Sequence, residues 1–170
     1  MKPLQNNNII LIGMPGCGKS TIGIEVAEQI GYGYIDSDSV IVAREGRPLS
    51  EIIADVGMEK FLDIEAKVNS ELAASRCVIA TGGSVIYRDS AMQKLREKGK
   101  IVYLKHSYET IQARLGDLKK RGVVLKEGFT LLDLYKERTP LYERYADIVV
   151  ELENGPKSVT VARVLSALEK

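Results

Sequence analysis

A glycine-rich segment near the N-terminus limits what this chain can fold into more than any other feature. Residues 13–20 read G-x-x-x-x-G-K-S and directly follow an apolar run, 8–12, that has the length of a buried strand. A helical pattern from about 18 to 30 comes next. Glycines let the backbone turn sharply and point its N–H groups inward. The segment therefore predicts a strand, a phosphate-binding loop and a helix in direct succession.

Short apolar runs alternate with longer amphipathic stretches along the rest of the chain. Further strands are expected at 34–36, 77–80, 101–104 and 148–150, and further helices at 90–98, 108–115 and 158–168. Continuously apolar strands separated by helices indicate a parallel sheet that is covered on both faces. The 170 residues therefore predict one three-layer α/β/α domain.

Two segments do not fit this alternation. Residues from about 38 to 74 read as a helical insertion with a break at Gly57. Residues from about 116 to 130 are polar and contain glycine, which favours a mobile loop.

Composition excludes several classes of protein. A formal net charge of +1 provides no global field for collecting nucleic acid, so any anion site must be local. No apolar run approaches the roughly 20 residues of a membrane helix, and the polar N-terminus does not look like a signal peptide. Two cysteines cannot form a disulfide framework, and a single histidine argues against structural zinc. We expect a cytoplasmic protein, monomeric rather than oligomeric, whose partners include neither nucleic acid nor membrane.

The residue types of the loop suit a nucleoside triphosphate. Lys19 would reach the β- and γ-phosphates, and the Ser20 hydroxyl would bind Mg²⁺. The N-terminus of the following helix adds its positive dipole end. The alternative is a strand–helix turn that is merely rich in glycine. Cys17 has two interpretations: a thiol activated at a helix N-terminus, or a small residue tolerated in the loop.

Acidic and glycine residues follow two of the other expected strands. Asp36-Ser37-Asp38 ends the second strand, where ligands bind in open α/β sheets. One aspartate could support magnesium, and the other could accept or orient the proton of an attacking hydroxyl. Capping of a helix is the alternative role for these residues. After the third strand, residues 81–84 read T-G-G-S, which permits close approach of a ligand or forms a plain turn.

Three arginines add candidate anion contacts. Arg114 and Arg121 flank the polar loop, and Arg138 opens the segment R-T-P-L-Y at 138–142. Arginine pairs with carboxylate or phosphate through two parallel hydrogen bonds. For each of them alone, a solvated surface charge is the alternative.

Together these motifs resemble the shikimate kinase family over essentially the whole chain. The phosphate loop, D-[ST]-D at 36–38, the glycines at 82–83, two arginines seven residues apart and R-x-P-L-Y carry the resemblance. The resemblance implies a fold like that of nucleoside-monophosphate kinases, with a five-stranded parallel sheet, a substrate-binding insertion at about 38–74 and a lid at about 116–130. It also implies transfer of the γ-phosphate of ATP to a hydroxyl of a small molecule, shikimate, giving shikimate 3-phosphate.

The resemblance assigns a role to each matched position. Lys19, Asp38 and Arg121 are the implied catalytic residues, with Arg121 folding over the phosphates. Arg114 would lie near the adenine, which packs at Pro156. The implied nucleotide site comprises Gly13, Gly16, Cys17, Gly18, Lys19, Ser20, Thr21, Arg114, Arg121 and Pro156. The implied acceptor site comprises Asp38, Gly82, Gly83 and Arg138, and the implied magnesium ligands are Ser20 and Asp36.

The sequence departs from the family pattern at three points. F-R-x-x-E reads F-L-D-I-E at 61–65, so Leu62 replaces an arginine that would share the acceptor carboxylate with Arg138. The third glycine is Ser84, and R-P-L-L in the lid reads R-G-V-V at 121–124. A hydrogen bond to a charged group contributes roughly 1.5–3 kcal/mol, so the missing arginine would weaken acceptor binding about 10- to 150-fold. Lys60 or Lys67 could partly substitute.

Three functions remain open on the sequence alone. The first is phosphorylation of shikimate. The second is phosphorylation of another small hydroxylated acceptor, with Leu62 lining an apolar wall. The third is ATP binding without phosphotransfer. The intact residues that argue against it are Lys19, Ser20, Asp36, Asp38 and Arg121. The sequence does not decide whether Asp38 is a base or only orients the hydroxyl.

Overall fold

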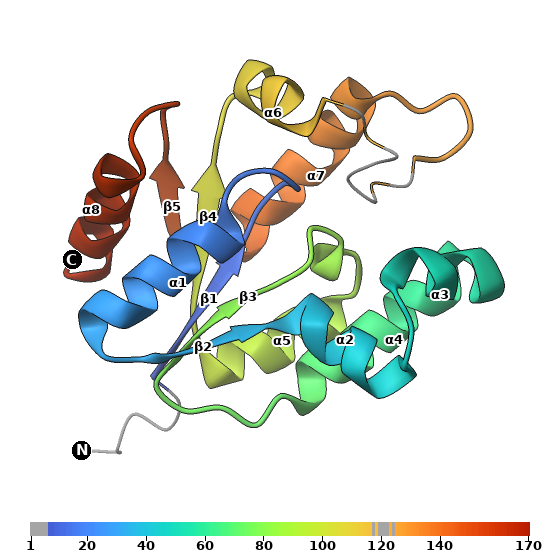
Figure 1. The fold of residues 1–170 in the computed structure, drawn as a ribbon, viewed down its shortest axis with the longest axis horizontal. Helices are drawn as coiled ribbons and strands as arrows, with labels where there is room; N and C mark the ends of the chain where they lie inside the picture. The colour runs from blue at the N-terminus through green and yellow to red at the C-terminus, as the bar shows by residue number, and fades with distance from the viewer. Residues whose placement is uncertain (1–6, 117, 119–122, 124) are drawn as a thin grey trace.

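The central element of the fold is a parallel sheet. The structure is a computed structural model that describes residues 7–116, 118, 123 and 125–170. Its sheet has five strands in the order β2-β3-β1-β4-β5 (Figure 1). The strands are β1 (Asn8–Ile12), β2 (Gly33–Asp36), β3 (Cys77–Ala80), β4 (Gly99–Lys105) and β5 (Ile148–Glu151). All pairings between neighbours are parallel, which confirms the predicted sheet.

Strand β1 lies in the middle of this sheet. Ile10 is in register with Ile79 of β3 on one side and with Ile101 of β4 on the other. Every residue of β1 is buried, as expected for a central strand whose two faces are both covered. Because all strands run in one direction, the loops after β1, β2 and β3 meet at one edge of the sheet.

Helices cover both faces of the sheet, which completes the predicted three-layer fold (Figure 1). Helix α1 (Lys19–Ile30) packs on β3 and contacts α8 (Lys157–Leu168). On the other face, α5 (Asp89–Lys98) and α7 (Leu131–Tyr145) contact β4. Helix α6 (Tyr108–Leu115) follows β4 and contacts α7.

The segment between β2 and β3 forms three helices that stand to one side of the sheet (Figure 1). They are α2 (Ser37–Glu45), α3 (Leu49–Val56) and α4 (Met58–Glu71). Gly57, at φ +83°, separates α3 from α4 at the expected break. These helices bury an apolar cluster of their own, formed by Ile41, Ile52, Phe61, Leu62 and Val68.

Helix α7 is the element that the sequence did not predict. Pro140 lies inside it, and proline removes a helical hydrogen bond and normally ends a helix. Two features outweigh this cost. The Thr130 and Asp133 side chains form a capping box at the N-terminus of α7. Tyr142 is fully buried and stacks on Tyr103 of β4, with ring centroids 5.0 Å apart.

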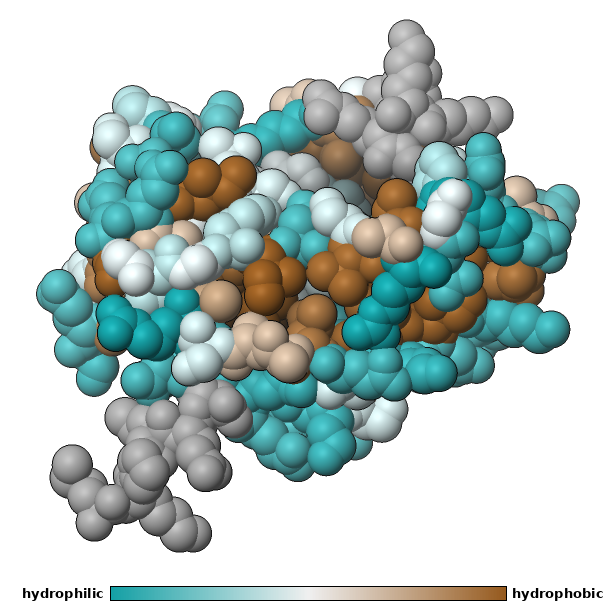
Figure 2. Space-filling view, turned by 60° about the horizontal axis from the view of Figure 1, so that its bottom comes forward, coloured by the Kyte–Doolittle hydropathy of each residue, from teal (hydrophilic) through white to brown (hydrophobic). Residues whose placement is uncertain are grey.

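Figure 2 shows polar and charged side chains around the rim of one face and apolar side chains gathered towards its middle. Within the described part of the chain, no helix is both long and apolar enough to cross a membrane.

Asn8 joins the start of β1 to two neighbouring segments. Its replacement should therefore lower the stability of the protein substantially. Its buried side chain donates hydrogen bonds to the carbonyls of Ala74 (2.8 Å) and Lys98 (3.0 Å) and accepts one from the Cys77 amide (3.0 Å). Asn8→Ala leaves these three backbone groups without that partner, so it should lower the free energy of unfolding by about 2–4 kcal/mol. Urea denaturation measures this loss. Asn7→Ala, at an exposed neighbouring position, is the control, and equal stability of the two variants would contradict the assignment.

Candidate active site

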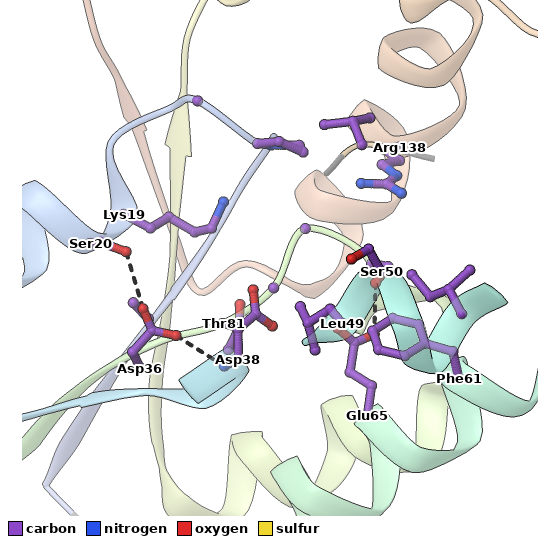
Figure 3. Close-up of a pocket in the computed structure, with 18 of the residues that line it drawn as sticks. Lys19, Ser20, Asp36, Asp38, Leu49, Ser50, Phe61, Glu65, Thr81 and Arg138 are labelled. Atoms are coloured by element: carbon purple, nitrogen blue, oxygen red, sulfur yellow. Dashed lines mark hydrogen bonds between the residues drawn. The ribbon is translucent and has the colours of Figure 1, made fainter. Parts of the chain in front are cut away.

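The loops at the carboxyl edge of the sheet enclose a cavity of about 680 Å³ (Figure 3). It is lined by the phosphate loop and the start of α1, the end of β2 and start of α2, helices α3 and α4, the turn after β3, and α7. Of the predicted site residues, the cavity wall includes Gly16, Gly18, Lys19, Ser20, Thr21, Asp36, Asp38, Gly82, Gly83 and Arg138. Residues from segments far apart in the sequence therefore reach one space.

The phosphate loop leaves the N-terminus of α1 open. Gly18 precedes α1 in the left-handed conformation, at φ +95°, and no side chain caps the helix. The first N–H groups of α1 are therefore available to an anion. At Gly13 a Cβ atom would lie 2.8 Å from both Cys17 Sγ and the Leu104 carbonyl oxygen. The loop can close against β4 only because this residue has no side chain.

Lys19 is folded back onto its own loop. Its Nζ donates hydrogen bonds to the carbonyl oxygens of Gly13 (2.7 Å) and Met14 (2.9 Å). In Figure 3 the Lys19 side chain extends into the cavity. A phosphate in the loop would replace these carbonyls as the partner of the ammonium group, because a charge-assisted bond to an anion is the stronger one.

Asp36 caps helix α2 and also contacts Ser20 of the phosphate loop. Its Oδ1 accepts hydrogen bonds from the amides of Asp38 (3.0 Å) and Ser39 (3.2 Å), so Asp36 itself is the N-cap of α2. Its Oδ2 accepts a 3.4 Å hydrogen bond from the Ser20 hydroxyl. A hydroxyl and a carboxylate at this distance fit a hard cation such as Mg²⁺, whose shell is completed by water and phosphate oxygens. No cluster of three or more histidine, cysteine or acidic residues that could hold a metal occurs in the described ranges.

Asp38 lies in the first turn of α2 and points into the cavity (Figure 3). Its buried Oδ1 has no hydrogen-bond partner among the described residues. Burial raises the pKa of this carboxyl, the charge of Asp36 raises it further, and Lys19 lowers it. An acceptor atom left without a donor in a polar cavity is suited to a ligand hydroxyl.

The turn after β3 fits closely between charged side chains. A Cβ atom on Gly82 would lie 2.7 Å from both Asp38 Oδ1 and Glu65 Oε2. One on Gly83 would lie 2.9 Å from an Arg138 guanidinium nitrogen. The two glycines are therefore required for close packing rather than only for a turn, and three charged groups surround them.

Arg138 is the cation on the α4 and α7 side of the cavity. It is buried, and its Nε donates a 3.2 Å hydrogen bond to the Tyr87 hydroxyl. That hydroxyl donates in turn to Glu137 Oε1 at 2.6 Å. The guanidinium carbon also lies 5.3 Å from the centre of the Tyr87 ring. Tyr87, which sequence reasoning missed, thus fixes the orientation of Arg138.

Glu65 is a second residue whose importance the sequence did not reveal. Its side chain on α4 is buried, and its Oε1 accepts a 2.8 Å hydrogen bond from the Ser84 hydroxyl. Burial raises the pKa of Glu65 to about 7; the charge of Asp38 raises it too, whereas Ser84 and Arg138 lower it. Ser84, which departs from the family glycine, therefore contacts the glutamate of the same F-R-x-x-E pattern in which Leu62 replaces arginine.

The structure corrects two expectations about position 62. Leu62 packs in the apolar cluster of α2, α3 and α4 and is not among the described residues that line the cavity. The apolar part of the wall comes instead from Leu49, Ile53, Met58 and Phe61. Lys60 and Lys67 are exposed and do not line the cavity, so neither substitutes for the missing arginine. The reason is the helical period, which turns these positions of α4 away from the cavity.

Four other predicted nucleotide residues lie outside the cavity wall, and one lies outside the described residues. Gly13 and Cys17 are buried within the loop, while Pro156 is exposed just before α8. Arg114 donates hydrogen bonds to the Gly16 carbonyl (3.2 Å) and to Asn154 Oδ1 (3.2 Å), so it joins α6, the loop and the segment before α8. Arg121, with most of the R-G-V-V segment, is not described.

His106 contacts the guanidinium group of Arg114. Its ring is buried, and Nε2 lies 3.4 Å from a guanidinium nitrogen of Arg114. Burial and the Arg114 charge lower the pKa of His106 to about 4. The imidazole is therefore neutral near pH 7 and can accept a hydrogen bond from Arg114.

Comparison with known proteins decides the family. The family model of shikimate kinase matches residues 15–169.

The chain belongs to the shikimate kinase family.

Relatives and solved structures agree with this assignment. A shikimate kinase of Pseudomonas paraeruginosa is 39% identical over 166 residues, 96% of each chain. One of Thermodesulfovibrio yellowstonii is 34% identical over 166 residues, 96% of this chain and 95% of the relative. The structure of a shikimate kinase from Acinetobacter baumannii in complex with shikimate has a TM-score of 0.88 and 31% identity, and the match covers 96% of this chain and 93% of that one. Membership of the shikimate kinase family makes the chain an ATP-dependent phosphotransferase that acts on an alcohol group, as predicted.

The buried carboxyl of Glu65 predicts a stability that depends on pH. Its folded-state pKa lies above its ordinary value of 4.5, at about 7. The folded protein therefore binds this proton more tightly than the unfolded chain does, and the resulting stability is lost as pH rises towards 7. Glu65→Gln removes this pH-dependent contribution to stability. Relative to the wild type, the variant should gain about 2–3 kcal/mol in unfolding free energy between pH 5 and pH 8.

Chemical denaturation at several pH values measures this difference. Glu59→Gln, at an exposed position on the same helix, is the matched control and should show no such trend. Parallel curves for the wild type and Glu65→Gln across this range would show that Glu65 is not a buried carboxyl with a raised pKa.

Proposed function

We propose that this chain transfers the γ-phosphate of ATP to a hydroxyl of shikimate, giving shikimate 3-phosphate. The observation that carries the proposal is one cavity in which Lys19 of the phosphate loop and Arg138 of α7 lie on opposite sides of Asp38 (Figure 3). A relative of 31% identity has been solved in complex with shikimate, which supports this choice of acceptor.

On the nucleotide side, the open N-terminus of α1 would hold the phosphates. The N–H groups of the loop and the Lys19 ammonium would stabilise negative charge on the transferring group. Ser20 and Asp36 would hold Mg²⁺, which when bound neutralises charge on the phosphate oxygens. Arg114 and Pro156 would contact the adenine, and Arg121 would fold over the phosphates as part of a lid formed by residues 116–130.

On the acceptor side, α2, α3 and α4 would form the substrate-binding insertion. Asp38 Oδ1 would accept the proton of the attacking hydroxyl or orient that hydroxyl towards the γ-phosphate. A loose transition state needs little help from a base, so correct orientation supplies most of the effect. Arg138 would bind the carboxylate of shikimate beside the bare backbone of Gly82 and Gly83.

A second candidate is transfer to a different small hydroxylated acceptor. The observation that favours it is the absence, among the described lining residues on this side, of any cation besides Arg138. A carboxylate in this site would be held by one guanidinium instead of two. We also infer that the enzyme acts as a monomer and that it lies in the cytoplasm. The two unpaired cysteines, Cys17 and Cys77, support the second of these inferences, because disulfides are rare in that compartment.

Lys19→Ala tests the nucleotide half of the proposal. The variant should fold normally and lose turnover by at least about 100-fold, because the loop lysine stabilises charge on the transferring phosphoryl group. ADP release in a coupled assay measures turnover, and thermal melting checks the fold. Lys94→Ala, an exposed lysine on α5, is the control. Near-normal ADP release by a folded Lys19→Ala variant would exclude this loop as the site of transfer.

Arg138→Met tests the acceptor half. Loss of the guanidinium should raise KM for shikimate roughly 10- to 150-fold, from about 1.5–3 kcal/mol for a charge-assisted bond. KM for ATP should remain unchanged, and kcat should change little, because the carboxylate is remote from the reacting hydroxyl. Arg144→Met, an exposed arginine of the same helix, is the control. The same assay with a panel of hydroxylated acceptors decides between the two candidates, since a neutral acceptor with a higher kcat/KM than shikimate would favour the second.

A further inference from the structure

Three charged side chains meet at two consecutive glycines on the acceptor side. Asp38 Oδ1 and Glu65 Oε2 each lie 2.7 Å from the position of a Gly82 Cβ, and an Arg138 nitrogen lies 2.9 Å from that of Gly83. The Glu65 carboxyl and the Arg138 guanidinium therefore border the same two-residue turn. The charge of Arg138 acts on Glu65 and lowers its pKa.

Glu65 has no opposite charge bound to it within the described part of the chain. None of the ion pairs recorded there includes Glu65. Its recorded side-chain partner is the neutral hydroxyl of Ser84. A carboxylate in this position is buried, faces a cavity and is only weakly compensated, so the neutral acid competes with it.

The groups that face Glu65 come from each element packed around α4. Asp38 faces it from α2, and Arg138, fixed by Tyr87 of the 3₁₀ turn at Val85–Tyr87, faces it from α7. The other charged groups of α4 lie outside the cavity wall: Lys60 and Lys67 are exposed, and Glu71 pairs with Arg44. Glu59 and Asp63 bind Arg88 at the start of α5.

The exposed carboxylates of α2 and α3 also lie outside this site. Asp55 of α3 is paired with Arg47, and Glu51 of α3 and Glu45 of α2 are exposed. Lys19 lines the opposite side of the cavity. The local balance at Glu65 is thus set by Asp38, Arg138 and Ser84.

We propose that Glu65 selects the acceptor by charge: as a neutral acid it donates a hydrogen bond to the acceptor beside Arg138, and as a carboxylate it competes with an acceptor carboxylate for that arginine. This inference rests on the proposed function, because it takes an anionic hydroxy acid as the acceptor. Glu65 thus makes acceptor binding depend on pH, and Ser84 sets the pH at which the change occurs.

The direction of the effect follows from the charges. An acceptor carboxylate stays ionised throughout the neutral range, so its own titration plays no part. Only the fraction of enzyme with neutral Glu65 binds it well, and this fraction falls as pH rises past about 7. Apparent KM should therefore increase about tenfold between pH 6 and pH 8. The hydrogen bond from Ser84 favours the ionised form, so its loss should move this increase to higher pH.

The test measures KM for shikimate and for its uncharged methyl ester from pH 6 to pH 8.5 at saturating ATP and Mg²⁺. We expect the wild-type KM for shikimate to rise with pH and that for the ester to stay nearly constant. In Glu65→Gln, KM for shikimate should no longer depend on pH, and in Ser84→Ala the rise should begin at higher pH. Glu59→Gln should behave as the wild type.

Different failures have different meanings. A wild-type KM for shikimate that does not change with pH, or a pH dependence that persists in Glu65→Gln, overturns the role of Glu65 while leaving shikimate phosphorylation intact. Equal pH dependence for shikimate and its ester also overturns it, and this comparison needs only the wild type, so it holds even if a variant does not fold. No ADP release with shikimate at any pH refutes the proposed function, and the inference falls with it.

Discussion

The pairing of β1 with β3 and β4 is the constraint on which the remaining structure depends. It fixes the end of β1, where the phosphate loop begins, beside the end of β3, where Thr81 starts the glycine turn. The Thr81 hydroxyl and amide both donate to the Leu11 carbonyl, at 2.8 and 3.2 Å, and extend this pairing into the loops. Asn8 fastens the opposite end of β1 through three hydrogen bonds. Segments that lie more than 60 positions apart in the sequence are thus held in a fixed arrangement around the cavity.

Glycine determines how closely the two halves of the site approach each other. Side chains on Gly82 or Gly83 would displace Asp38, Glu65 or Arg138. The Tyr142 hydroxyl donates a 2.6 Å hydrogen bond to the Gly83 carbonyl and so fixes this turn to α7. A buried tyrosine stacked on β4 therefore holds the backbone that separates the acidic groups from the arginine.

Local patterns predicted most of the fold, because they report local physics. The apolar run of β3 and the amphipathic period of α6 predicted the bounds of these two elements correctly. The glycine motif predicted the position of the turn that leads into α1. Helix α7 was missed because Pro140 is a local signal for termination, whereas burial of Tyr142 against β4 is a tertiary effect. Motifs likewise found Lys19, Asp36, Asp38 and Arg138, which do lie around one cavity. No pattern could show that Glu65 meets Ser84, or that Leu62 packs away from the cavity, since both depend on how α4 is seated.

The two sides of the cavity differ in how firmly their side chains are positioned before any ligand binds. Arg138 is buried, ordered by Tyr87 and Glu137, and carried by a helix whose N-terminus is capped. Lys19 instead donates its hydrogen bonds to the carbonyls of its own loop and would have to exchange them for those to a bound phosphate. Rigid positioning of an acceptor lowers the entropy lost when the reacting atoms meet, whereas the nucleotide side can gain new charge-assisted bonds as it closes. These contacts favour an acceptor site whose geometry exists before a ligand binds. They favour a phosphate site whose geometry is completed only when its ligand binds.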